Sequence, residues 1–405
     1  MRVRGSRLAW LNGSWACLAC SLVLPSLGLL QKYFGLVGAL VYTIVSLFAL
    51  AWAAVLVYRR IWRAIPDAWL TWLAGLTIML LLLFVILSYP LANSGRFGGG
   101  SDNDEALIIA ATELADGSYP YSQYTYLGNR ISPMPGAVIL ALPFVFLGHV
   151  GLQNVFWVAI FLWLSGRLYH DRRQALLLLG TILLLSPVIA RNLATGADYV
   201  ANTLYVLAAS VWAIEAASYR RDGGWLPFLT AIFLGVTLSS RANFLLLLPL
   251  VFAAIYQRSD LATAIRSSTL TLISFLAITL PFYLWNPAEF SPLITYSELA
   301  QFDSVLPAAG LFIPALAAAS ALGLSLRENR TTTSYLGHAA IVLAIPVLAG
   351  TLLASVRQGT INLSFLNFGV FFLFFGAAAG WPGVMDAAGI PPASSLGPPM
   401  VESEQ

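Results

Sequence analysis

Charge is what this sequence has least of. Only 10% of its 405 residues are charged, whereas 59% are hydrophobic and the mean hydropathy is +0.80. Water-soluble domains carry about 25% charged residues. A soluble core could not hide this much apolar surface, so the composition excludes a soluble enzyme, and it also excludes intrinsic disorder, collagen and coiled coil. The remaining class is a polytopic membrane protein surrounded mostly by lipid.

Lysine, cysteine and histidine are also scarce. Lys32 is the single lysine, and the net charge of +3 is too small to indicate nucleic-acid binding. Cys17 and Cys20 form a C-x-x-C pattern that could be redox-active or bind a metal, but no second pair of ligands exists. We therefore interpret both cysteines as membrane-core residues. The three histidines are scattered and form no metal-binding pattern.

Long apolar runs dominate the chain. A membrane-crossing helix needs about 20 apolar residues. The first run follows three arginines, as in a signal peptide, but more runs follow closely and we interpret it as an uncleaved span. The segment 133–148 is ambiguous because it is short and holds three prolines. The other candidate spans are 8–30, 37–57, 68–88, 151–168, 174–190, 200–218, 225–240, 243–257, 267–285, 306–325, 337–355 and 361–380.

The positive-inside rule decides whether 133–148 crosses the membrane. If it does not cross, 15 basic residues are cytoplasmic and six are outside; if it crosses, the count becomes 9 inside and 12 outside. We therefore place 133–148 at the outer face, as a juxtamembrane or re-entrant piece covered by protein or by a watery cavity. The prediction is an all-α, multi-pass protein of the cell membrane with about 12 transmembrane helices and cytoplasmic termini.

This topology divides the chain into four parts. Residues 1–88 form an N-terminal three-span segment, and 89–150 form an outer loop with juxtamembrane helices. Residues 151–380 form a transmembrane bundle. The tail 381–405 is rich in Pro, Gly and Ser and is predicted to be disordered and cytoplasmic.

Carboxylates gather in the outer loop that follows the third span. Residues 104–116 are predicted to form a short amphipathic helix, since apolar residues recur from Leu107 to Leu114 at helical spacing. Gly117 stands where such a helix would end. Asp102, with Glu105 three residues later, matches the spacing of a capping box, which leaves Asp104 unexplained.

Further charges lie at the predicted outer ends of spans. Asp198 is in the loop 191–198, and Arg191, Arg241 and Arg357 run against the inward bias of basic residues. Ionisable groups at membrane depth are costly and usually have a functional partner, although any one of these arginines could simply snorkel to the interface. Several outer arginines facing several outer acids suit a site with a carboxylate base and cationic stabilisation of an anionic group.

The outer loop contains the segments SDNDEALIIAATELADGSYPY and, after it, ISPMPGAVILALPFVFLG. These segments resemble the first outer loop of the GT-C membrane glycosyltransferases, which show an acidic pair, a short helix, G-x-x-P-Y and a Pro-rich segment. Three later segments resemble the family in order: SPVIARNLATGADYVANTLYVLA, LSSRANFLLLLPLVF and LPFYLWNPAEF. The resemblance covers roughly residues 90–300. One departure is that three spans precede the acidic loop here, where many members have one, and the acceptor stays open.

The resemblance implies an enzyme that transfers a sugar, as in polyprenyl-phosphate-mannose-dependent mannosyltransferases, from a polyprenyl phosphate to a glycan, lipid or protein acceptor at the outer face. A carboxylate would take the proton of the acceptor hydroxyl, and arginines would stabilise the leaving phosphate. The residues carried over are Asp104 as base, with Asp102 second and Glu105 beside them. Those assigned to substrate binding are Asp198, Arg241, Arg191, Arg357, Arg130 and Tyr121, with Arg241 first for the donor phosphate.

Two alternatives stay open. Asp102-Asn103-Asp104 is also a D-x-D pattern, which binds a divalent metal in some glycosyltransferases, although no metal ligand is assigned here. The second functional class is a transporter or flippase for a lipid-linked or anionic substrate, which would also use intramembrane charges and Pro-broken helices. No internal repeat between the halves supports it, and the acids lie in outer loops.

Overall fold

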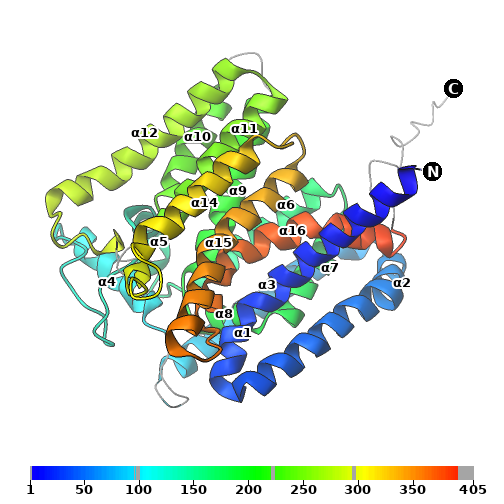
Figure 1. The fold of residues 1–405 in the computed structure, drawn as a ribbon, viewed down its shortest axis with the longest axis horizontal. Coiled ribbons are helices and arrows are strands. Elements are labelled where there is room, and N and C mark those ends of the chain that lie inside the picture. Colours follow the sequence, from blue (N-terminus) through cyan, green and yellow to red (C-terminus); the bar gives the residue numbers. More distant parts are fainter. Residues whose placement is uncertain (1, 95, 97–100, 220–223, 294–297, 391–405) are drawn as a thin grey trace.

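The computed structural model describes residues 2–94, 96, 101–219, 224–293 and 298–390. Their regular elements are helices, and the one strand-like pairing among them is a bridge between Tyr124 and Arg130. The all-α prediction is therefore confirmed. In chain order (Figure 1) the elements are α1 (Arg2–Trp52), η1 (Ala53–Val57), α2 (Tyr58–Ala64), α3 (Asp67–Ala92), α4 (Asn103–Ala115), α5 (Pro135–Phe146), α6 (Leu152–Leu168), α7 (Arg172–Leu185), α8 (Pro187–Thr195), α9 (Tyr199–Tyr219), α10 (Trp225–Leu238), η2 (Ala242–Leu247), α11 (Leu248–Arg258), α12 (Leu261–Trp285), η3 (Ser291–Leu293), α14 (Ala309–Ser325), α15 (Thr332–Gln358), η4 (Ser364–Gly369) and α16 (Val370–Ala387).

Within the described residues, six helical segments are long and apolar enough to cross a membrane, or seven if α7 and α8 form one span broken by an 85° bend. Five other apolar helices are only 10–17 residues long. These lengths support a membrane-embedded helical protein and do not confirm the predicted count of about 12 spans. The six segments are Gly13–Ile61, Asp67–Ala92, Tyr199–Ser218, Leu261–Trp285, Thr332–Gln358 and Ser364–Ala387.

Helix α1 consists of two arms that meet at Gly35. This glycine has φ 67° and ψ −174°, a conformation that a side chain would strain. Figure 1 shows the two blue arms diverging from this point, one toward the N-terminus and one toward α2. The break lies between the two spans that the sequence predicts at 8–30 and 37–57.

The first arm of α1 crosses α16 at very close range. Gly376 and Gly380, four residues apart on α16, both face α1. A Cβ at Gly380 would lie 2.6 Å from the Ser14 carbonyl oxygen, and one at Gly376 would overlap the Ser21 hydroxyl. Small residues at this spacing let two backbones approach, which is how helices associate where lipid removes the hydrophobic driving force.

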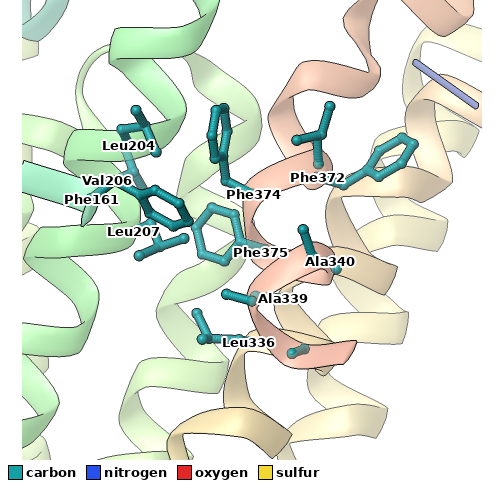
Figure 2. Packing of buried hydrophobic residues seen from close by; sticks show 14 of the residues in the cluster. Phe161, Leu204, Val206, Leu207, Leu336, Ala339, Ala340, Phe372, Phe374 and Phe375 are labelled. Carbon is teal, nitrogen blue, oxygen red and sulfur yellow. The ribbon is translucent and has the colours of Figure 1, made fainter. Parts of the chain in front are cut away.

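The core of the bundle lies where α9, α15 and α16 meet α6. Figure 2 shows Phe374 and Phe375 of α16 directed toward Leu204 and Leu207 of α9 and toward Phe161 of α6. The rings of Phe161 and Phe374 meet edge to face, with centroids 5.1 Å apart. Helix α9 is buried on nearly every side, so the segment that follows Asp198 is held rigidly by its neighbours.

Contacts between connecting segments separate into two groups. Residues 119–131 contact 286–291 at the end where α4 and α5 lie (Figure 1). Elsewhere Arg173 pairs with Asp67, and Gln257 and Arg258 bond to 327–332. Each of these contacts joins segments that the charge distribution assigns to the same side of the membrane.

The prediction of disorder from residue 381 is wrong at its beginning. Helix α16 continues to Ala387, and Trp381 is completely buried, with its ring edge to face with Tyr58. Pro382, one of the residues that suggested disorder, lies within this helix. The helix tolerates it because tertiary packing buries most of the surrounding residues. Residues 391–405 lie outside the described part of the chain.

The α1–α16 crossing gives a stability prediction. Gly376→Leu and Gly380→Leu should each lower the free energy of unfolding in mixed micelles by about 1–3 kcal/mol or more, because an added side chain must push α1 away. Gly323→Leu on α14 is the matched control, since a Cβ there meets nothing within 4 Å. Equal stability of all three variants would show that the crossing does not hold the bundle together.

Candidate functional site

The predicted amphipathic helix exists as α4, and it presents the acidic segment to the protein interior. Leu107 and Ala111 are fully buried in clusters that include residues of the neighbouring helix α5, while Ile108 is exposed. Gly117 follows with φ 74°, which confirms the predicted stop. The docking of this apolar face buries Asp104 at the first turn of the helix, with 5% of its surface exposed.

Asp104 is held through one of its two carboxylate oxygens. Its Oδ2 accepts from the Tyr89 hydroxyl at 2.8 Å and from the Asn93 side-chain amide at 3.0 Å. Its Oδ1 is buried and has no partner among the described residues. Burial raises the pKa of Asp104 above its ordinary value, and the hydrogen bond from Tyr89 opposes this rise. A buried acid with a raised pKa and a free oxygen is a candidate functional group.

The capping-box interpretation of Asp102 and Glu105 is wrong. Asp102 stands at the N-cap position, but its side chain makes no bond to the helix. Its Oδ2 instead accepts from Thr125 at 2.7 Å and from Asn129 at 2.8 Å. Glu105 accepts from the backbone N–H of Tyr126 at 2.7 Å. Both acids therefore hold the exposed turn 124–130, and tertiary contacts replace the local capping bonds.

Asp198 and Arg241 form a buried ion pair. Arg241 Nη2 lies 2.6 Å from one oxygen of Asp198 and 2.8 Å from the other, and Asp198 is 0% exposed. Asn202 donates to the same carboxylate at 2.8 Å. Arg241 Nη1 donates to the Ser132 hydroxyl at 3.1 Å, and its guanidinium lies over the Tyr199 ring at 5.3 Å. Arg241 Nε has no partner among the described residues.

A glycine brings the ion pair and Asp104 together. Gly196 has φ 71°, and a Cβ there would lie 2.5 Å from the Tyr89 ring and 3.3 Å from Asp104 Cβ. The backbone between α8 and α9 therefore packs directly against the Asp104–Tyr89 pair. Asp198 follows only two residues later, so the two acids that the sequence selects belong to one cluster.

The Pro-rich segment after the acidic loop docks on the end of α10. The backbone N–H of Met134 donates to the Ser240 carbonyl, and that of Gly136 donates to the Ser239 carbonyl at 2.9 Å. A side chain at Gly136 would collide with the Val236 carbonyl. This contact carries Ser132 to Arg241.

The G-x-x-P-Y turn docks on the end of α12. The Tyr119 hydroxyl donates to the Asn286 carbonyl at 2.9 Å, and Tyr121 packs edge to face against Phe290 and Phe282. The Tyr121 hydroxyl is buried without a partner among the described residues, and burial raises its pKa above the ordinary value. Two segments that the sequence singles out separately, 117–121 and 280–290, therefore touch.

The remaining predicted residues differ in position. Arg191 is half buried on α8 and its side chain makes no hydrogen bond or ion pair within the described residues. Arg357 is exposed and donates to Gln301 at 3.0 Å. Arg130 is exposed in the 124–130 turn. Neither Arg357 nor Arg130 contacts Asp104, Asp198 or Arg241 through any described bond. In the described chain no three potential ligands among His, Cys, Asp and Glu gather to hold a metal.

Sequence reasoning missed several polar residues of this cluster. Asn202 bonds Asp198, and the Tyr205 hydroxyl donates to Asn202. Asp198, Asn202 and Tyr205 recur at helical spacing along an apolar helix, and this polar stripe is a signal that the sequence carries. Tyr89 and Asn93 lie four residues apart at the end of the third span. Polar residues are common at the end of a span, so the sequence did not mark these two as part of a site.

Comparison of the sequence with protein-family profiles and with curated proteins, and of the fold with solved structures, finds no match. The chemistry is therefore argued from the cluster itself. It combines a buried acid with one free oxygen, a compensated ion pair and an arginine on α8 that has no described partner. Such an arrangement suits proton removal beside an anionic group.

The ion pair gives a stability prediction. Arg241→Gln leaves a buried carboxylate without its cation, and breaking a buried pair in this way costs about 3–5 kcal/mol. Adding Asp198→Asn to Arg241→Gln should recover most of that loss. The measurement is the free energy of unfolding of the single and double variants in mixed micelles. An Arg241→Gln variant as stable as the wild type would show instead that the fold does not depend on the ion pair.

Proposed function

We propose that the protein is an integral membrane glycosyltransferase that moves a sugar from a polyprenyl-phosphate donor to an acceptor hydroxyl at the extracytoplasmic face. The observation that carries the proposal is the junction of Asp104 with the Asp198–Arg241 pair through Gly196. Four of the five GT-C-like segments contribute residues to this junction. The sugar, the acceptor and the anomer are left open.

In this proposal Asp104 is the general base. Its Oδ1 takes the proton of the acceptor hydroxyl as the acceptor oxygen attacks the anomeric carbon. The bond between that carbon and the phosphate oxygen breaks, and the polyprenyl phosphate leaves with the added negative charge. Because Oδ1 is enclosed, the acceptor has to enter the protein to reach it, which also excludes water from the reaction.

The geometry changes which arginine is assigned to the donor phosphate. The guanidinium of Arg241 is already engaged by Asp198 and Ser132, so Arg241 organises the site. Arg191 is half buried and close enough to Tyr199 to interact with it electrostatically. A guanidinium binds phosphate oxygens through a planar pair of donors. We therefore assign the developing phosphate charge to Arg191.

The count of about 12 spans and their orientation belong to this proposal. The predicted spans overlap helices or one arm of α1, but 174–190 runs across the 85° break between α7 and α8. In the proposal, the short helices cross together with their flanking turns. The charge distribution places the Asp104 end outside the cytoplasm.

One observation favours the alternative of a transporter or flippase. Helices α7 and α8 meet at 85° at Ser186 and Pro187, which gives a discontinuous helix inside the bundle. Such breaks form substrate sites in transporters. Sugar transfer by the purified protein separates the two functions, because a transporter leaves the donor chemically unchanged.

The orientation is tested by cysteine accessibility. In a background without Cys17 and Cys20, Ser122→Cys should react with an impermeant thiol reagent from outside intact cells, and Ser259→Cys only after permeabilisation. Both serines are exposed in connecting segments. Labelling of both cysteines from the same side would contradict the topology.

The base is tested by Asp104→Asn. The substitution should lower transfer by about 10²–10⁴-fold, since general-base catalysis contributes this much. In the wild type, transfer should fall as the pH drops through the raised pKa of Asp104, because the base acts only when deprotonated. Turnover of purified protein in lipid nanodiscs is the measurement, with Asp116→Asn in the exposed turn after α4 as control. Normal transfer by both Asp104→Asn and Asp102→Asn would place the site elsewhere.

A further inference from the structure

The third span ends in two side chains that reach the Asp104 carboxylate. Tyr89 and Asn93 lie one helical turn apart at the end of α3, and both donate to Oδ2 of Asp104, at 2.8 Å and 3.0 Å. No residue of α4 itself bonds this oxygen through its side chain. The side chains that orient the acid therefore come from another helix, ten or more residues earlier in the chain, and the backbone N–H groups of Asp104 and Glu105 also bond its carboxylate.

Tyr89 is itself held from two sides. The His149 ring packs against the Tyr89 ring with centroids 4.5 Å apart, and Gly196 leaves room for its other edge. Pro90 follows it inside the helix. These two contacts restrict movement of the half-buried Tyr89 ring away from Asp104.

We propose that Tyr89 and Asn93 are positioning residues that fix Oδ2 of Asp104 so that Oδ1 is presented to the acceptor hydroxyl. The inference rests on the proposed function, since it assigns the base of that reaction its orientation. Two donors on one oxygen leave the other as the proton acceptor. They also anchor the acidic loop to α3, which gives the N-terminal spans a role in the site.

The same contacts determine when Asp104 carries its proton. The titratable groups around it are Tyr89 from α3, Glu105 and Asp102 from its own segment, and Tyr126 from the 124–130 turn, with His149 behind Tyr89. Donation from Tyr89 favours the carboxylate form. Its removal should therefore raise the pKa of Asp104, so that a base that acts when deprotonated is active only at higher pH.

The test compares Tyr89→Phe and Asn93→Ala with the wild type, using the full chain in nanodiscs. Tyr256→Phe, an exposed tyrosine on α11, is the matched control. The first readout is labelling of Asp104 by dicyclohexylcarbodiimide, followed across pH by peptide mass spectrometry. A protonated carboxyl group transfers its proton to the reagent and its oxygen adds to the central carbodiimide carbon. The second is the pH profile of sugar transfer.

We expect the labelling midpoint of Tyr89→Phe to move to higher pH and the acidic limb of the transfer profile to move with it. Transfer at neutral pH should fall by about tenfold or more, as for loss of a hydrogen bond to a charged group, and should recover partly at higher pH. Asn93→Ala should change both readouts in the same direction, and Tyr256→Phe should change neither.

The outcomes separate this inference from the function on which it rests. An unchanged labelling midpoint in Tyr89→Phe and Asn93→Ala, with both variants folded by thermal unfolding, would overturn the positioning role. A drop in transfer that is equal at every pH would overturn it as well, because that is the signature of a merely structural residue. If the midpoint shifts but the wild type transfers no sugar, the contacts stand and the proposed function is wrong.

Discussion

The Asp198–Arg241 ion pair is the interaction on which this end of the protein depends. The side chain of Asp198 is 0% exposed and that of Arg241 is 12% exposed. Neither charge would be stable there alone, because the free-energy cost of burying an isolated charge is far larger than the gain from a single contact. Each partner is also tied to a different segment, Asp198 to α9 through Asn202 and Arg241 to the Pro-rich segment through Ser132. The pair therefore joins three stretches that are distant in sequence, and the cluster can form only when all three are in place.

Close backbone approach is the second constraint. Gly196 lets the α8–α9 junction reach Tyr89 and Asp104, and Gly136 lets the Pro-rich segment reach Ser239. These two glycines serve the site in the way that Gly376 and Gly380 serve the α1–α16 crossing. In a bundle surrounded by lipid, packing and satisfied polar groups hold helices together. Small residues thus appear where a contact must be tight, at the site as well as in the core.

The sequence predicted the residue types of the site better than their bonds. Composition and apolar runs predicted an all-α membrane protein, and the helix α4 and its glycine stop were also predicted. The capping box failed because Thr125 and Asn129 compete for Asp102, and a tertiary partner cannot be read from local spacing. The end of α16 was missed for the same reason, since burial of Trp381 outweighs the local preference of Pro and Gly.

The two buried acids of the cluster are satisfied to different degrees, and this difference assigns their roles. Every oxygen of Asp198 has a partner, one of them cationic, so its bonding capacity is met within the protein. The side-chain donors to Asp104 are neutral and both bond one oxygen, and its other oxygen is buried without a partner among the described residues. Buried polar groups without partners are rare and costly. In the proposed reaction, the acceptor hydroxyl would supply the partner that Oδ1 lacks among the described residues.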